Sequence, residues 1–372
     1  MDALRKNIAA VLGAVGVPVI GVCKANGYGL GLVPLARTLL DCGVSTLAVA
    51  TLEEAQALRE AGLDGAMLLL SSTALPAEAE QILHLGLIGT VGSAASAQAL
   101  ERAAAAAGAT LPVHLKLDCG FGRFGFLPGE EAQAAQALAD APHLRVEGVF
   151  SHLSQSFSTG PVTAQQCAAF LAMLGRLKAL GVDPPMRHLA NSCAALIHPD
   201  TRLDAVRIGS AFAGRLPMPT DLKLQPVGRF VCEVAELHQL PKGHNVGYTN
   251  VYRTRRPTTA AVLTAGLADG LLRVHGKDAF RPFDRLRYLW HAVKGLAGPQ
   301  ALCCTINGHR VPTIGRVGTS GTVVDVTGLP VEVGDLACFA VNPMFIDSAV
   351  QRVYIETEQP AAPAPTGVAP QP

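Results

Sequence analysis

Lys24 is the first residue in the chain whose type and position suggest chemistry. It follows the apolar run Val19–Cys23, and Gly27, Gly29 and Gly31 come soon after it. A lysine amine partly withdrawn from water behind such a run has a lowered pKa, which makes it a nucleophile and a usable base. Glycines beside it let the backbone come close to a ligand. A solvated surface cation is the ordinary alternative, so Lys24 alone does not decide between the two.

Other residues of catalytic type are grouped in short segments along the chain. Arginine suits the binding of carboxylate or phosphate, and histidine suits proton transfer. Taken singly, each of them could equally be an ion-pair arginine or a histidine of the core. In chain order, these segments are His114–Arg123, Gly148–His152, His188–Ser192, Asp204–Ser210, Val246–Tyr252 and Gly315–Val317.

Eight short apolar runs would arrange these segments around one sheet. Apolar strands that alternate with helical patterns predict a parallel α/β sheet, and eight units before residue 209 fit a closed (β/α)8 TIM-type barrel. In such barrels the C-terminal ends of the strands face the active site, which is where Lys24 stands. An open doubly wound sheet is the alternative. The candidate strands are Pro18–Cys23, Thr46–Thr51, Ala66–Ser71, Leu87–Val91, Pro112–Leu117, Arg145–Ser151, Met186–Ala190 and Asp204–Ile208.

The pattern changes near Leu224. From Val227 onward apolar residues alternate with polar ones, and turn residues separate the runs. This alternation predicts a mainly antiparallel β domain after the barrel. The end of the chain is rich in alanine and proline and has no core-forming pattern, which predicts disorder. The predicted parts are a barrel over 1–222, a β domain over 223–358 and a disordered tail over 359–372.

Composition excludes several classes of function. The 30 Lys and Arg residues balance 29 Asp and Glu residues, so the chain has no electrostatic footprint for nucleic acid or an anionic membrane. No apolar run reaches the length of about twenty residues that spans a bilayer. The nine cysteines are an odd number without Cys-x-x-Cys spacing. They predict reduced thiols in a cytoplasmic protein, with no metal site.

Taken together, the segments resemble those of one known family. Val22–Gly29 reads Val-Cys-Lys-Ala-Asn-Gly-Tyr-Gly and is similar to the motif of alanine racemases in which a lysine binds pyridoxal 5′-phosphate (PLP) as a Schiff base. The other segments follow in the family's order over most of residues 1–358. The resemblance implies a fold-type III PLP-dependent enzyme that carries PLP on Lys24.

The resemblance also implies a role for each matching residue. Arg207 would face the pyridine nitrogen of PLP, and Arg123 would bind the substrate carboxylate beside Lys116, a lysine open to carbamylation. Lys24, Arg123 and His152 are expected to be catalytic. The phosphate would be held by the Tyr28 and Ser192 hydroxyls and by backbone N–H groups near Gly209. The full set expected to contact the cofactor is Lys24, Tyr28, His188, Asn191, Ser192, Arg207, Gly209, Ser210 and Ser348.

The chain departs from the family at its second catalytic base. The family has a tyrosine in Gly-Tyr-Ala-Asp-Gly, whereas this chain has Leu267 within Gly-Leu-Ala-Asp-Gly. Thr319 and Ser320 stand where the family has Met-Asp, and Ser348 aligns with a tyrosine that narrows the pocket. We therefore expect a widened substrate pocket. Its expected lining residues are Lys116, Arg123, Leu267, Arg316, Thr319 and Ser320.

The segment 274–305 contains an insertion, because it is roughly twenty residues longer than the same segment of the family. It carries several aromatic and basic residues, Trp290 among them. A plain surface excursion is one interpretation. Because the insertion separates two pocket-forming segments, a lid or a supplier of pocket residues is the other.

Leucine cannot carry a proton, and losing a general base costs on the order of 10²–10⁴ in rate. We therefore predict a one-base reaction at the α-carbon of an amino acid larger than alanine: aldol or retro-aldol chemistry, decarboxylation or α-proton exchange. A true racemase with a relocated base is the alternative, and a catalytically silent PLP-binding protein is a third. The resemblance also implies a homodimer with shared active sites. The candidates for a relocated base are Asp269, Tyr288, His291, Cys303 and Cys304.

Overall fold

The structure is a computed structural model that describes residues 1–273, 282–295 and 301–356 of the chain. These residues form two compact units. The first comprises Met1–Val227 and the described residues from Arg352 on, and the second is the described part of Gly228–Gln351. The predicted tail at 359–372 lies outside the described residues, and so does part of the predicted insertion at 274–305.

The first unit contains eight parallel strands, one for each apolar run that predicted them. Hydrogen bonding joins them in two sheets of order β3-β2-β1-β8 and β4-β5-β6-β7. Parallel bridges from Leu68 to Ile88 and from His188 to Ala205 connect the sheets at both edges and close the ring. The strands are β1 (Val19–Val22), β2 (Thr46–Val49), β3 (Ala66–Leu69), β4 (Gly89–Val91), β5 (Leu111–Lys116), β6 (Leu144–Phe150), β7 (Met186–His188) and β8 (Val206–Ile208).

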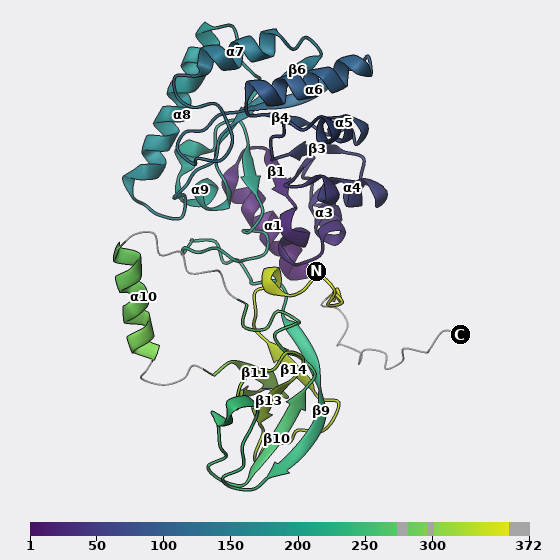
Figure 1. Cartoon of the computed structure of the whole chain (residues 1–372), viewed down its shortest axis with the longest axis vertical. Helices are drawn as coiled ribbons and strands as arrows, with labels where there is room; N and C mark the ends of the chain where they lie inside the picture. The colour runs from purple at the N-terminus through teal and green to yellow at the C-terminus, as the bar shows by residue number, and fades with distance from the viewer. Residues whose placement is uncertain (274–281, 296–300, 357–372) are drawn as a thin grey trace, which may run out of the picture. The chain divides into compact units, whose positions relative to one another are not determined.

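Helices alternate with these strands and lie around them in Figure 1. Most strand residues are buried because helices cover the outer face and side chains fill the interior. The predicted (β/α)8 barrel is confirmed. The helices of this unit are α1 (Asp2–Val15), α2 (Lys24–Tyr28), α3 (Leu32–Asp41), α4 (Leu52–Glu60), α5 (Pro76–His84), α6 (Ala94–Ala106), α7 (Glu131–Ala139), α8 (Pro161–Ala179), α9 (Ser192–Ile197) and η1 (Pro199–Thr201).

The C-terminal segment Arg352–Glu356 belongs to the first unit, although the sequence analysis placed it in the β domain. Tyr354 donates a hydrogen bond from its hydroxyl to the carbonyl of Leu30 at 2.9 Å, and Arg5 pairs with Glu356 at 3.0 Å. These contacts join the segment to α1 and to the loop that follows Lys24. The boundary between the units lies at Val227–Gly228, where the sequence analysis placed it at 222–223.

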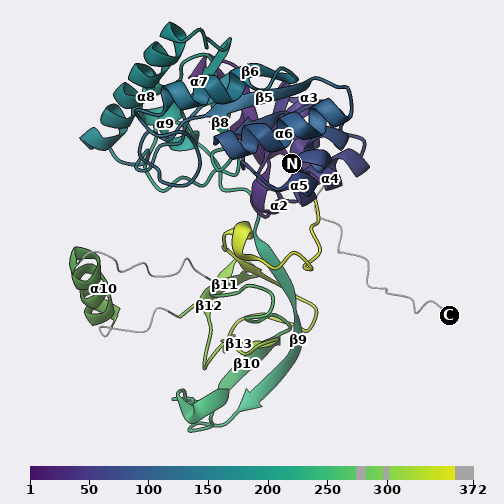
Figure 2. The ribbon, with the colours of Figure 1, turned by 45° about the horizontal axis from the view of Figure 1, so that its top comes forward.

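The second unit is an antiparallel sheet of order β12-β11-β14-β9-β10-β13. A bridge from Thr313 to Val324 joins its two edges, so the sheet is nearly a barrel. Its core includes Val234, Leu263 and Phe339. The long strand β9 curves beside its neighbours in Figure 2, and the predicted β domain is confirmed. The elements are β9 (Phe230–Leu240), η2 (Tyr248–Asn250), β10 (Thr258–Leu263), α10 (Pro282–Gly295), β11 (Cys303–Ile306), β12 (His309–Pro312), β13 (Thr322–Asp325), β14 (Leu336–Phe339) and η3 (Pro343–Phe345).

In the described residues, no helix has both the length and the apolar character that crossing a membrane requires.

Candidate active site

Lys24 stands where β1 ends and the chain makes a left-handed turn. Ala25, Asn26 and Gly27 have φ angles of 54°, 50° and 62°. Left-handed backbone costs roughly 1–2 kcal/mol for each residue that carries a Cβ. Local hydrogen bonds offset this cost, including those from the Gly29 N–H to the carbonyls of Ala25 and Asn26, both at 3.0 Å. The turn ends the strand abruptly and leaves the Lys24 side chain at the C-terminal end of the barrel.

Glu54, in the first turn of α4, holds this turn in place. Its carboxylate accepts the N–H of Ala25 at 2.6 Å and that of Ala50 at 2.9 Å. It therefore links the ends of β1 and β2. No role for Glu54 was predicted from the sequence. The available signal was the pair Thr51 and Glu54 at capping-box spacing, although Glu54 uses its side chain on Ala25 and Ala50.

The charge on Lys24 is unfavourable in this environment. Burial lowers the pKa of Lys24, the Arg123 guanidinium lowers it further, and Glu54 acts in the opposite direction. A lowered pKa raises the fraction of the unprotonated amine, which is the nucleophilic form. Lys24 is therefore suited to bind a carbonyl compound covalently.

A buried polar chain crosses the barrel interior from His114 to Arg207. Arg207 donates from Nη1 to Nδ1 of His188 at 2.9 Å, and His188 Nε2 lies 2.9 Å from His114 Nδ1. Because a guanidinium can only donate, His188 carries its proton on Nε2 and donates it to His114. Burial, together with the charge of Arg207, lowers the pKa of both histidines, so both are neutral at pH 7.

Arg207 is buried and held rigidly. Its Nη1 also donates to the carbonyl of His188 at 2.9 Å, and its Nη2 donates to the carbonyls of Ser151 at 2.6 Å and Leu189 at 3.1 Å. Burial lowers the pKa of Arg207 to about 10, so it stays charged at neutral pH. A guanidinium can only donate hydrogen bonds, which suits an unprotonated pyridine nitrogen.

A small cradle suited to a phosphate lies between α9 and the end of β8. The Ser192 hydroxyl accepts the N–H of Gly209 at 3.0 Å. The Asn191 side chain accepts the N–H groups of Cys193 and Ala194, both at 3.1 Å, so it caps α9 and holds Ser192 at its start. These bonds bring the Ser192 hydroxyl, the start of α9 and the end of β8 together, which are the segments expected at the phosphate. By capping α9, Asn191 thus positions Ser192 at the predicted phosphate site.

Gly209 lets Tyr28 approach this cradle. A Cβ at residue 209 would overlap the Tyr28 hydroxyl and ring. The buried Tyr28 side chain therefore packs directly on the backbone at Gly209, just after β8. Ser210 follows and is half-buried. The Lys24 amine, the Arg207 donor and this cradle together match the three polar ends of PLP, so the residues present fit this cofactor.

Gly209→Ala is expected to weaken PLP binding. Overpacking a filled site typically costs about 1–3 kcal/mol, so the Kd for PLP should rise roughly tenfold or more. Titration of the apoprotein with PLP, followed by absorbance, measures this change. Gly175→Ala is the matched control because Gly175 lies in α8 with no atom within 4 Å of the added Cβ. Equal Kd values for the two variants would show that Gly209 does not border the cofactor.

Lys116 and His152 also lie within the polar interior. The Lys116 ammonium nitrogen is 4.1 Å from the centre of the Phe150 ring. Burial, with the charges of Arg207 and Arg123, lowers the pKa of Lys116 to about 7. Burial and the same cations lower the pKa of His152 far below its usual value. The His152 and Phe121 rings pack in a T-shaped arrangement, with 4.8 Å between their centres. His152 is therefore a neutral imidazole.

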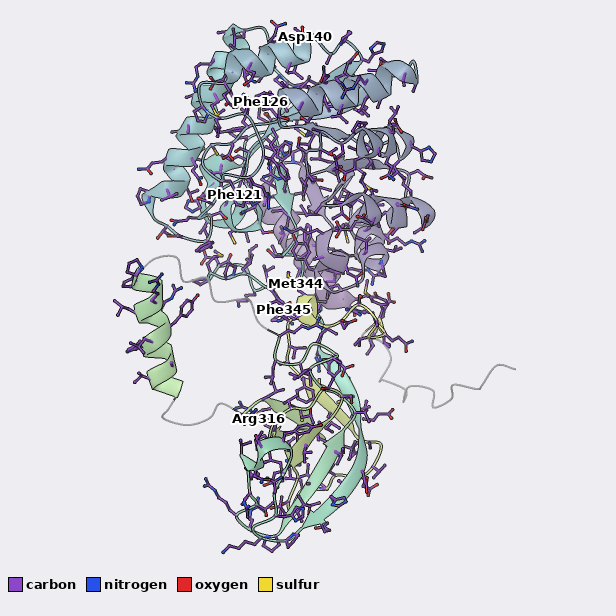
Figure 3. The ribbon with its side chains drawn as sticks, viewed as in Figure 1. Phe121, Phe126, Asp140, Arg316, Met344 and Phe345 are labelled. Atoms are coloured by element: carbon purple, nitrogen blue, oxygen red, sulfur yellow. The ribbon has the colours of Figure 1, made fainter. Side chains whose placement is uncertain are left out.

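Arg123 lies on the loop after β5 and is exposed. Its guanidinium packs over the rings of Phe121 and Phe124, 4.7 and 5.7 Å from their centres. Figure 3 shows Phe121 on this loop. Its charge contributes to the lowered pKa of Lys24 and of Lys116. Arg123 thus lies near enough for its charge to act on both lysines.

Four of the predicted pocket residues lie in the second unit. Leu267 donates its N–H to the carbonyl of Gly318 at 2.9 Å, and Ala268 donates to Thr319 at 2.9 Å. This backbone pairing brings Leu267 beside Thr319. This unit exposes the side chains of Leu267, Arg316, Thr319 and Ser320. Figure 3 labels Arg316. Ser348, expected at the phosphate, is also exposed in this unit.

The candidates for a relocated base differ in their surroundings. Cys304 is 2% exposed within the β-domain core, and burial raises its pKa to about 12, so it is unsuited to proton transfer at neutral pH. Cys303 is half-buried and donates to the carbonyl of Ala301 at 3.4 Å. Asp269 accepts the N–H of Gly266 at 2.8 Å. Tyr288 is half-buried on α10, and the His291 side chain lies outside the described residues.

Comparison with known proteins agrees with this geometry. The alanine racemase N-terminal domain matches residues 1–217, and the alanine racemase C-terminal domain matches residues 227–351. Alanine racemase of Desulfosudis oleivorans is 36% identical over 353 residues, which cover 90% of this chain and 84% of that protein. Alanine racemase of Symbiobacterium thermophilum is 36% identical over 341 residues, with the same coverage.

Solved structures show the same likeness. Alanine racemase from D-cycloserine-producing Streptomyces lavendulae has a TM-score of 0.78 and 32% identity, covering 91% of this chain and 85% of that one. Alanine racemase from Bacillus anthracis with bound L-Ala-P has a TM-score of 0.78 and 29% identity, covering 91% and 83%. The chain therefore belongs to the alanine racemase family of PLP-dependent enzymes.

Proposed function

We propose that this enzyme acts at the α-carbon of an amino acid larger than alanine by a reaction that needs one base. The observation that carries the proposal is the leucine at position 267, where the family has its second catalytic base, a tyrosine. Aldol or retro-aldol cleavage, decarboxylation and one-sided α-proton exchange all meet this requirement. Each leaves one face of the α-carbon without proton transfer.

The first unit retains the residues that such a reaction needs. When bound, PLP draws electrons from the α-carbon of an attached amino acid. Lys24 is the base on one face, since its lowered pKa increases the fraction of free amine, the form that can take a proton. Arg123 pairs with the substrate carboxylate through a charge-assisted bond. Arg207 only donates, so it leaves the ring nitrogen unprotonated and keeps the electron sink weak.

The second unit supports a larger substrate. Leu267, Thr319 and Ser320 are exposed side chains without a group that exchanges protons near neutral pH. Thr319, Ser320 and Ser348 are smaller than the family residues they replace, which leaves room for a bulkier side chain. We propose that these residues complete the site of a second subunit in a homodimer.

A true racemase with a relocated base is the second candidate, and the 36% identity to alanine racemases over 90% of the chain favours it. Asp269 and Tyr288 are the strongest candidates for the base. Asp269 lies two residues from Leu267, and its carboxylate is fixed by the Gly266 N–H. Cys304 is the weakest candidate because of its burial.

Incubation of the PLP-loaded enzyme in D₂O with amino acids of both hands tests the proposal. Mass spectrometry reports deuterium at the α-carbon and any cleavage products, and chiral chromatography reports inversion. We expect a larger amino acid to be labelled with retention or to be split, and alanine to invert slowly. Free PLP at the same concentration controls for uncatalysed exchange. Rapid inversion of alanine would contradict the proposal and favour the relocated base.

A further inference from the structure

Asp118 is a buried carboxylate at the start of the loop that carries Arg123. The loop leaves β5 after Lys116 and returns to it at Phe126. The Asp118 N–H donates to the Phe126 carbonyl at 2.9 Å, and the Phe126 N–H donates to the Lys116 carbonyl at 3.1 Å. Figure 3 labels Phe121 and Phe126 on this loop. The two bonds close its base, while residues 120–124 are exposed.

The Asp118 side chain receives four consecutive backbone N–H groups from this loop. Oδ1 accepts from Gly120 at 2.8 Å and Phe121 at 2.7 Å, and Oδ2 accepts from Gly122 at 2.7 Å and Arg123 at 3.1 Å. Asp118 itself is 3% exposed. Successive N–H groups that converge in this way form an anion-binding concavity, here filled by the chain's own carboxylate.

The conformation of the loop depends on this arrangement. Gly120 and Gly122 have φ angles of 118° and 79°, which L residues rarely adopt. A Cβ at Gly125 would overlap the backbone of Leu117 and Asp118. Burial alone would raise the pKa of Asp118, yet the four N–H donors hold it below its usual value. The carboxylate is therefore the charged centre around which the loop folds.

Arg123 is the last residue in this set of four. Its backbone is bound to Asp118, while its guanidinium packs over Phe121, another of the four, at 4.7 Å. The Arg123 charge reaches Lys24, Lys116 and His152, where after burial it is one of the causes that lower each pKa. The folded loop thus holds the guanidinium at the end of the barrel where Lys24 lies.

We propose that Asp118 is a positioning residue that folds the 118–126 loop around its carboxylate and so sets the affinity of Arg123 for the substrate carboxylate. This inference rests on the role proposed above for Arg123. Asp118 itself touches neither substrate nor cofactor. Its contribution is the placement of a cation that would otherwise move with an open, glycine-rich loop.

Asp118→Asn is the isosteric test. An asparagine offers one oxygen acceptor and turns an NH₂ group toward two of the four N–H donors, so half of the arrangement is lost. A displacement of about 1 Å at a reacting or binding group costs up to roughly 10²-fold. We expect the variant to bind PLP normally, while Arg123 loses its fixed place. Asp140→Asn is the control because Asp140 is exposed at the end of α7, as labelled in Figure 3.

The readout is the preference of the PLP-loaded enzyme for alanine over alaninamide, measured by spectral titration. Both amines can react with bound PLP, but only alanine offers a carboxylate. We expect the ratio of the two affinities to fall roughly tenfold or more in Asp118→Asn and in Arg123→Gln, and to stay unchanged in Asp140→Asn. A lowered ratio in Arg123→Gln with an unchanged ratio in Asp118→Asn would overturn the positioning role. An unchanged ratio in Arg123→Gln would contradict the role proposed for Arg123.

Hydrogen–deuterium exchange of the unaltered PLP-loaded enzyme supplies a test that needs no variant. Amides 120–123 lie on an exposed loop, yet the carboxylate should slow their exchange by at least about tenfold relative to an unbonded loop. Rapid exchange of these amides would overturn the proposal even if Asp118→Asn fails to fold. Where that variant folds, faster exchange confined to this loop is the expected result.

Discussion

Lys24→Ala is expected to abolish catalysis and covalent attachment of PLP. The side chain supplies both the nucleophilic amine and the base on one face of the α-carbon, and loss of such a residue costs on the order of 10⁴-fold or more in rate. The left-handed turn begins at Ala25 and is held by backbone groups, by Asn26 and by Glu54, so it does not need the lysine side chain. The fold should therefore survive the substitution.

The visible absorption band of lysine-bound PLP and the rate of α-proton exchange are the measurements. Lys178→Ala is the control, since Lys178 is exposed on α8 and pairs with the exposed Asp183 at 2.8 Å. Its spectrum and rate should match those of the parent. A Lys24→Ala protein that keeps the band would show that PLP is attached to another lysine.

Much of the fold could be predicted because each barrel strand is a short, buried apolar run. The strands of a parallel barrel are buried on both faces, so their sequences are unbroken apolar runs. All four residues of β1 (Val19–Val22) are buried in this way. The strand ends then mark where the site must lie. This reasoning placed Lys24 at the C-terminal end of a strand, whereas a role for Arg207 was implied only by the resemblance to the family.

The hydrogen bonds that hold the site residues in place could not be predicted in the same way. The bond between His114 and His188 joins residues from different strands, and Glu54 and Asp118 act on backbone N–H groups that carry no sequence signature. A carboxylate next to glycines was visible at Asp118, but spacing alone does not say that one side chain will receive four donors. The return of Arg352–Glu356 to the first unit likewise depends on hydrogen bonds that link distant parts of the chain.

These supporting hydrogen bonds do not depend on position 267, where we propose that the catalytic tyrosine of the family is replaced. The residues that hold Lys24, Arg123 and Arg207 all belong to the first unit, whereas Leu267 and Thr319 belong to the second. On the proposed function, a change at position 267 would alter the reaction through the second unit, while the residues that hold Lys24, Arg123 and Arg207 stay as they are.

Leu267→Tyr is expected to raise the rate of alanine racemisation by roughly 10²–10⁴-fold, because it returns a group that can exchange a proton on the second face of the α-carbon. Leu267 is 45% exposed and its backbone is paired with Gly318, so a larger ring can be accommodated without disturbing the core. Chiral chromatography of alanine started from either hand measures the rate.

Leu267→Phe is the control that separates proton transfer from the filling of space, since it adds the same ring without the hydroxyl. We expect it to leave the racemisation rate near that of the parent. An equal gain in both variants would mean that a narrower pocket, and not a base, limits the reaction on alanine. If Leu267→Tyr gives no gain over a parent that already racemises alanine, the second base lies elsewhere, and Asp269 and Tyr288 become the residues to replace.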